Sequence, residues 1–149
     1  MILELENGVV SLLQNAGLPV SPWSGRPEEL FERPKYIPTI RTVIERVSLE
    51  KNSGHSFDLN AHVAIILFFR SLRDEGKGAY PIIKTIIDTT ANKTANGFLL
   101  SPKDITLLYH ESGEFAYKLT FTAEGKYIVP QKSEPLVKEI TYEEVPYAG

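Results

Sequence analysis

Residues 57–69 carry the clearest pattern in the chain, because every second side chain is apolar. Successive side chains of a strand point to opposite faces, so this alternation predicts a strand with one buried face. Its apolar positions are Phe57, Leu59, Ala61, Val63, Ile65, Leu67 and Phe69. Residues 64–69 are apolar at the other positions too. That half is expected to lie in the centre of a sheet, or to have its second face covered by another subunit.

Two stretches show the 3.6-residue periodicity of amphipathic helices. The first covers residues 2–16 and ends before Gly17 and Pro19, which form a helix stop signal. The second covers residues 79–91 and follows the charged turn after the long strand. The apolar stripes are Leu5, Val9, Leu12, Leu13 and Ala16 in the first helix, and Ile82, Ile83, Ile86 and Ile87 in the second.

Other segments have the composition of strands. Residues 36–49 are rich in strand formers and precede a turn cluster at 51–54. Residues 104–111 and 114–123 flank Ser112-Gly113, which predicts a β-hairpin. In its second strand one face carries Phe115, Tyr117, Leu119, Phe121 and Ala123.

The remaining stretches are weaker signals. Residues 92–96 are polar and predict a loop, and residues 126–130 form a candidate short strand. Residues 131–149 contain apolar side chains without a helical stripe, which predicts an extended arm, loosely packed or bound to a neighbour.

The pattern as a whole predicts an α+β fold. We expect a central, mostly antiparallel sheet of four to five strands packed against two main helices. Residues 1–125 form a single domain in this interpretation, and residues 126–149 form a C-terminal arm. The predicted core comprises Leu5, Val9, Leu12, Ile83, Ile87, Leu119 and Phe121.

Composition narrows the class of protein. A chain of 149 residues is long enough to bury a core. Its net charge of −3 provides no electrostatic footprint for general binding to nucleic acid or anionic membranes. The absence of cysteine excludes disulfides and thiolate chemistry. The N-terminus has no basic region typical of a signal peptide, and the longest apolar run, 63–69, is too short to span a bilayer as a helix.

The turn Gly76-Lys77-Gly78 lies between a strand and a helix, where helix amides often hold phosphate. It matches neither the P-loop nor the dinucleotide-binding motif. We interpret the glycines as serving a tight turn that needs positive φ. A small nucleotide-binding enzyme using this turn remains an alternative of lower weight.

Other candidate chemistry is sparse. His55, His62 and His110 lack the spacing of metal ligands, and no G-x-S-x-G nucleophile elbow is present. The adjacent carboxylates at 28–29 and 143–144 would not face one another on regular structure. Trp23 is either a packing residue or an interface anchor. We therefore expect no catalytic, cofactor or metal site, and a protein that is not an enzyme.

The ordered segments resemble the Mu-like phage tail terminator family, small proteins encoded beside the tail sheath gene of contractile-tailed phages and prophages. The likeness covers roughly residues 1–123 and excludes the arm. Besides the N-terminal helix and the long strand, it is carried by Pro22-Trp23-Ser24-Gly25, Glu28-Glu29-Leu30, Pro38-Thr39-Ile40, Arg70-Ser71-Leu72-Arg73, Gly78-Ala79-Tyr80 and Tyr117-Lys118-Leu119-Thr120-Phe121.

The resemblance implies a structural protein of the virion tail, assembled in the cytoplasm of the bacterial host. It implies a tail-terminator-like fold and a homohexameric ring on the end of the tail tube. Such a ring stops tail polymerisation and joins the tail to the head connector. Its partners would be its own copies, the tail tube or sheath protein, and a head-completion or connector protein, with no sequence-specific nucleic acid and no membrane. A monomeric head–tail adaptor is the main alternative.

Two regions without a clear partner in their own chain are the candidate interface. The turn 70–77 carries three basic residues beside Asp74 and Glu75, and the arm 131–149 has a surplus of glutamates, so opposite charges suit a head-to-tail contact that closes into a ring. The candidate interface residues are Arg70, Arg73 and Lys77 in the turn and Leu136, Val137, Ile140 and Tyr142 in the arm.

Overall fold

The structure is a computed structural model of the 149-residue chain. It describes residues 1–21, 23, 25–30, 32, 34–74, 78–111, 113–130, 143–144 and 147–148. The helices are α1 (Ile2–Asn15), the 3-10 turn η1 (Pro27–Glu29) and α2 (Ala79–Thr90). The strands are β1 (Thr39–Ser53), β2 (Ser56–Phe69), β3 (Thr94–Ala95), β4 (Phe98–Glu111), β5 (Glu114–Ile128), β6 (Glu143–Glu144) and β7 (Tyr147–Ala148).

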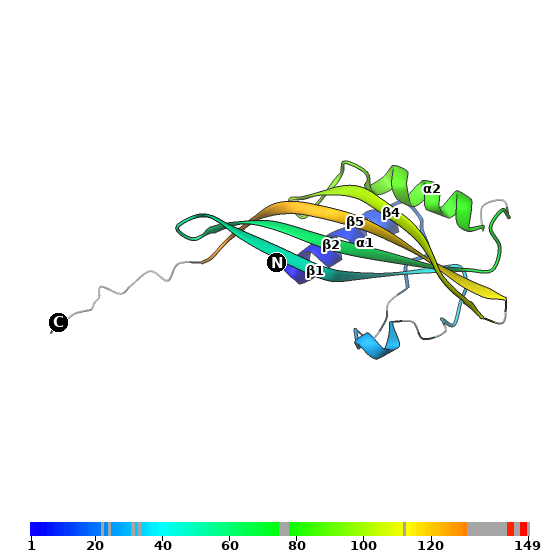
Figure 1. Cartoon of the computed structure of the whole chain (residues 1–149), viewed down its shortest axis with the longest axis horizontal. Helices are drawn as coiled ribbons and strands as arrows, with labels where there is room; N and C mark the ends of the chain where they lie inside the picture. Colours follow the sequence, from blue (N-terminus) through cyan, green and yellow to red (C-terminus); the bar gives the residue numbers. More distant parts are fainter. Residues whose placement is uncertain are drawn as a thin grey trace.

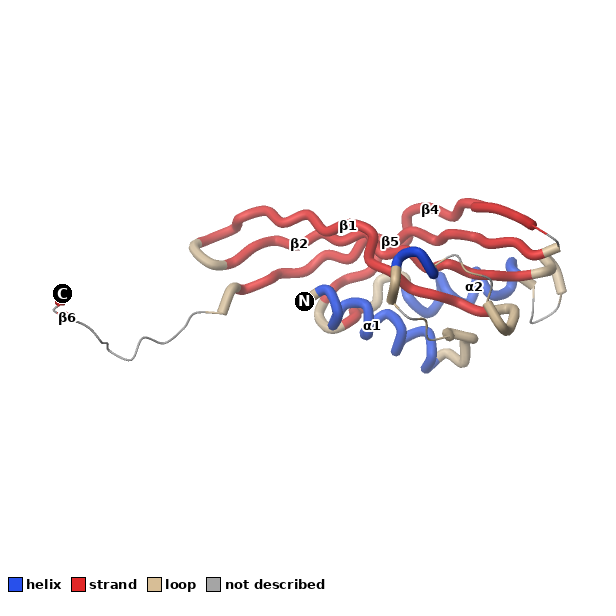
Figure 2. Tube along the Cα trace, turned by 90° about the horizontal axis from the view of Figure 1, so that it is seen from below, coloured by secondary structure: helices blue, strands red, loops and turns tan. Residues whose placement is uncertain are grey.

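The first five strands form one antiparallel sheet in the order β1-β2-β5-β4-β3 (Figure 1). Both main helices lie on the same side of this sheet (Figure 2). The end of the sheet with the β1–β2 hairpin extends past the helices, and the β4–β5 hairpin lies at the opposite end. The predicted α+β architecture, an antiparallel sheet on two helices, is therefore confirmed.

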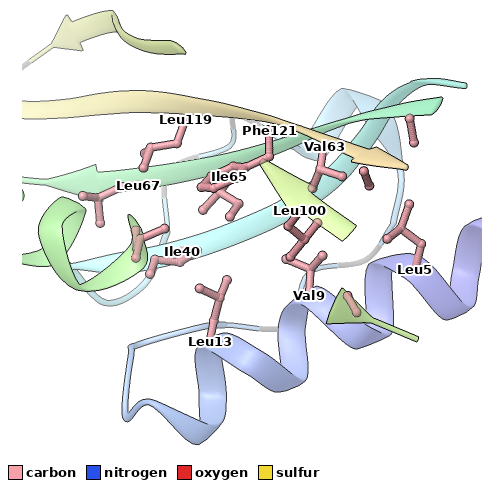
Figure 3. Packing of buried hydrophobic residues seen from close by; sticks show 14 of the residues in the cluster. Leu5, Val9, Leu13, Ile40, Val63, Ile65, Leu67, Leu100, Leu119 and Phe121 are labelled. Carbon is pink, nitrogen blue, oxygen red and sulfur yellow. The ribbon is translucent and has the colours of Figure 1, made fainter. Parts of the chain in front are cut away.

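The core lies between the helices and the covered face of the sheet (Figure 3). Leu5, Val9 and Leu13 of α1 point toward the sheet, where Ile65 and Phe121 are also fully buried. Of the predicted core, Leu5, Val9, Leu119 and Phe121 are buried, whereas Leu12, Ile83 and Ile87 are only partly buried. In α2 the buried isoleucines are Ile82 and Ile86, since the helix turns that part of its stripe to the sheet.

Several predicted boundaries were wrong at sheet edges. The stretch 92–96 was predicted as a loop but contains β3, and β4 begins at Phe98, six residues before the predicted start. The main chain of Asn92 donates to the Leu100 carbonyl and that of Leu100 to the Lys93 carbonyl, which extends the pairing. Residues 126–128 belong to β5 instead of forming a separate strand, because they continue its pairing with residues 56–58 of β2.

The second face of the sheet has a small apolar cluster of its own. Ala64, Ile66, Phe68 and Ala116 are buried there, although the helices lie on the other side. Long polar side chains of the same chain cover part of it. Lys118 of β5 reaches across β2 to Glu45, with 2.5 Å between Nζ and Oε2. Burial of residues 64–69 thus needs no second subunit, which decides between the two expectations for this stretch.

Arg41 covers part of the same apolar cluster and anchors the segment before β1. Its guanidinium carbon lies 4.9 Å from the ring centre of Phe68. Its Nη1 donates to the carbonyls of Glu29 at 3.3 Å and of Leu30 and Glu32 at 2.7 Å. Burial lowers the pKa of this guanidinium. A cation at these carbonyls acts as a C-terminal cap for η1 and holds it against the sheet.

Candidate assembly interface

The main-chain N–H groups at the start of α2 already have hydrogen-bond acceptors in the same chain. The main-chain N–H groups of Gly78, Ala79 and Tyr80 donate to the carbonyls of Asp74, Ser71 and Leu72 at 2.7, 2.8 and 3.0 Å, respectively. Anion sites at helix N-termini need free N–H groups. These three groups are occupied, so they are not available to hold a phosphate. Gly76 and Lys77 lie outside the described residues.

Gly78 has a different role from the predicted one. Its φ is −78°, so positive φ is not the reason for glycine here. A Cβ at this position would lie 2.6 Å from the Asp74 nitrogen and 2.7 Å from the Leu72 oxygen. Close approach of backbone to backbone therefore requires the glycine.

The histidines stay apart in the sheet. His55 lies in the β1–β2 turn, and His62 pairs with Thr122, whereas His110 pairs with Phe115, seven residues earlier in β5. Within the part of the chain that the structure describes, no group of three or more histidine, aspartate or glutamate side chains is arranged to hold a metal ion. No helix among the described residues is both long and apolar enough to cross a membrane.

The outer edge of β4 is the most unusual surface. β3 pairs with β4 only at Phe98 and Leu99, and the described residues supply no partner strand for positions 101–111. Ile105, Leu107 and Leu108 on this stretch are 49%, 50% and 37% exposed. Native proteins usually protect such edges with charge, proline or a covering segment, because they template strand pairing. Pro102, Lys103 and Asp104 protect the first part of this edge, whereas residues 105–108 leave exposed apolar side chains, which mark a contact surface.

A pocket of about 560 Å³ adjoins this edge near the β4–β5 hairpin. Phe69 stacks on Phe115 and on Tyr117, with ring centres 5.6 and 5.2 Å apart. Leu72 and Leu107 are the aliphatic residues of the lining. Burial, reinforced by the neighbouring Tyr80, raises the pKa of the Tyr117 hydroxyl. The pocket is thus an apolar, aromatic recess that opens beside an unpaired strand.

Two of the predicted interface residues line this pocket. Arg70 and Arg73 are exposed and belong to its lining, and Arg70 makes a 3.2 Å ion pair with Glu114. Lys77 and the four arm residues Leu136, Val137, Ile140 and Tyr142 lie outside the described residues. Sequence reasoning did not identify Ile105, Leu107 and Leu108 as surface residues. Ile105 and Leu107 alternate with the polar Asp104 and Thr106, which is a strand signal, but this pattern does not say which strand lies at the edge of the sheet.

A second groove, of about 550 Å³, lies between α1, the segment 20–30 and the edge of β1. Trp23 is half-buried in its lining, which agrees with a packing role and leaves part of the ring accessible. Thr42 also lines it, and its buried hydroxyl has no hydrogen-bond partner among the described residues. Burial raises the pKa of Glu6, on the α1 side of the same groove.

Comparison with known proteins shows the fold class but no family. Neither a protein-family model nor a curated protein matches the sequence. The structure is similar to a chain of the solved "virion of native gene transfer agent (GTA) particle", with a TM-score of 0.62 and 12% sequence identity. The match covers 83% of this chain and 96% of that chain. At this identity the likeness shows a shared fold.

Proposed function

We propose that this chain is a structural protein of a phage-like virion, with the role of a tail terminator. The observation that carries the proposal is the fold shared over 96% of the length of a chain from a gene transfer agent virion. The order of segments that resembles Mu-like tail terminators supports the same role from the sequence. In this proposal six copies form a ring on the end of a contractile tail tube, stop tail growth and join the tail to the head connector.

The surface is consistent with assembly. An apolar strand edge and an aromatic pocket lie side by side, and both would be covered by a neighbouring protein. A heterologous contact between different surfaces of one protein closes into a ring when the rotation allows it. The net charge of −3 per chain suits a channel for DNA, since phosphate contacts would retard passage. The proposed partners are other copies, the tail tube or sheath protein, and a head-completion or connector protein.

The direct test removes the chain from a phage that encodes it and measures tail length by electron microscopy. The proposal expects tails longer than wild type, unattached to heads, and restoration of normal length by the chain supplied in trans. Light scattering of the purified chain with and without tail tubes then measures the ring. Normal tails joined to heads in the absence of the chain would refute the proposal. Normal tail length with loss of head attachment would favour a monomeric adaptor.

A further inference from the structure

We infer that the free edge of β4 and its adjoining pocket receive the C-terminal arm of a second copy, with residues 136–142 added to the sheet as a strand. We call this surface the β4 docking site: positions 105–108 of β4 with the pocket lined by Phe69, Leu72, Phe115 and Tyr117. The inference rests on the proposed assembly of copies and names the contact that holds neighbours together.

The docking site has the two components of recognition by strand addition. The unpaired main chain of β4 offers hydrogen bonds to any extended peptide, and a pocket beside it selects side chains at alternate positions. Leu107 lies on the same face of the sheet as Tyr117, because the two are register partners, and it lines the pocket. An added strand would therefore direct its side chains of that face toward the recess.

The arm has the matching sequence. Between 136 and 142 one side of an extended chain would carry Leu136, Lys138, Ile140 and Tyr142. Three of these four are apolar, and Ile140 and Tyr142 belong to residue types enriched in strands. The recess, lined by aromatic and leucine side chains, suits residues of this kind.

The charges are complementary. Arg70 and Arg73 are exposed in the lining of the docking site. The arm carries four glutamates, at positions 134, 139, 143 and 144, against two lysines. Opposite charges at the rim of an apolar contact steer the approach and fix orientation, while the apolar side chains supply most of the affinity.

Reach favours another copy as the donor of the arm. β5 ends at Ile128, at the end of the sheet opposite the β4–β5 hairpin (Figure 1). From Ile128 back to the level of Tyr117 is eleven strand residues, about 36 Å. Leu136 follows Ile128 by eight residues, which span at most about 29 Å when fully extended. A chain could therefore bring Ile140, twelve residues beyond Ile128, to its own pocket only with the linking residues almost fully extended, about 43 Å at most, whereas a neighbour's arm is under no such limit.

The absence of cysteine allows a clean test with the full-length chain. One preparation carries Leu107→Cys, and a second, with a tag of different mass, carries Ile140→Cys. Leu107 is half exposed, so the substitution leaves the core intact. The control replaces Leu107→Cys by Leu49→Cys on β1, a leucine of matched exposure at 51%. The two preparations are mixed with tail tubes, oxidised mildly and analysed by mass.

The inference expects a disulfide between the two differently tagged chains, in several-fold excess over the Leu49→Cys control. Moving the arm cysteine through positions 136 to 142 should give yields that rise and fall with a period of two, because only alternate side chains of a strand face Leu107. Ile105→Cys serves as a second acceptor. Reversing charge by Arg70→Glu with Arg73→Glu should reduce the yield at low salt, and Arg46→Glu with Lys51→Glu on the far hairpin should not.

Failure here is separable from failure of the proposed function. Rings that assemble without this cross-link, or with the control yield, would overturn the docking inference and leave the terminator role standing. A second variant carries both cysteines in one chain. If it forms a disulfide within a monomer, the arm lies on the β4 edge of its own chain, and the docking inference is overturned. Tails of normal length without the chain would refute the proposed function independently.

Discussion

Replacing Arg41 by methionine should destabilise the fold and release the segment before β1. Arg41 is only 8% exposed, and its Nη1 donates to three carbonyls of residues 29, 30 and 32. Methionine keeps an unbranched apolar stem against Phe68 and removes the charge and every hydrogen bond. Arg41→Lys is the matched variant, because it keeps a charge but loses the planar group that stacks on the ring.

The expected loss in the free energy of unfolding is the difference between two opposing effects. Hydrogen bonds from a charged donor contribute about 1.5–3 kcal/mol, and a cation over an aromatic ring adds about 0.5–2 kcal/mol. Removing a buried charge recovers part of its desolvation cost, which burial already expresses by lowering the pKa of the guanidinium. We expect a net loss of about 2–4 kcal/mol for Arg41→Met, and roughly half of that for Arg41→Lys.

Urea unfolding measures the global loss, and the fluorescence of Trp23 measures the local one. Trp23 is the sole tryptophan and precedes the anchored segment, so its emission should shift to the red when η1 detaches. A local release can leave global stability nearly unchanged. A loss below about 1 kcal/mol together with an unshifted emission spectrum would refute the reasoning that Arg41 anchors this segment.

Three further substitutions test the core, the turn and the α1 groove. Phe121→Ala should cost about 3–5 kcal/mol in urea unfolding, since Phe121 is fully buried; a loss under about 1 kcal/mol would contradict its place in the core. Gly78→Ala should lower the melting temperature, whereas Gly54→Ala, with open space around it, should not; equal melting temperatures would count against the close-approach argument. Burial raises the pKa of Glu6 above its ordinary value, so ionisation opposes folding and stability falls as pH rises from the ordinary pKa through the raised one. Glu6→Gln should therefore stabilise the protein at neutral pH and lose this advantage in acid, as thermal unfolding at both pH values would show; an equal effect at both would contradict the assignment.

The sequence predicted secondary structure correctly where a single periodicity dominates a segment. The alternation in residues 57–69 and 115–123 predicted the two central strands, β2 and β5. The helical stripe placed α2 within one residue of its observed end. These signals succeed because a period of two or of 3.6 follows from backbone geometry, which is local.

The candidate site was predictable only in part. Arg70 and Arg73 were singled out by charge and line the pocket beside β4. The occupied amides at the start of α2 could not be foreseen, because their partners are carbonyls of residues 71–74 whose path depends on the fold. Gly78 was predicted to need positive φ and instead needs space, since that requirement arises from backbone packed against backbone.

The sequence by itself determined the two main helices, the central strands β2 and β5, and the faces that these strands turn inward. Ile105 and Leu107 show what it left open: they share a sheet face with the core residues Leu119 and Tyr117, yet both are half exposed. Arg41 is the reverse case, a charged residue that the fold buries by placing three carbonyls and an aromatic ring around it. Periodicity states which way a side chain points, whereas only the tertiary structure decides what lies over it, and burial energy depends on the latter.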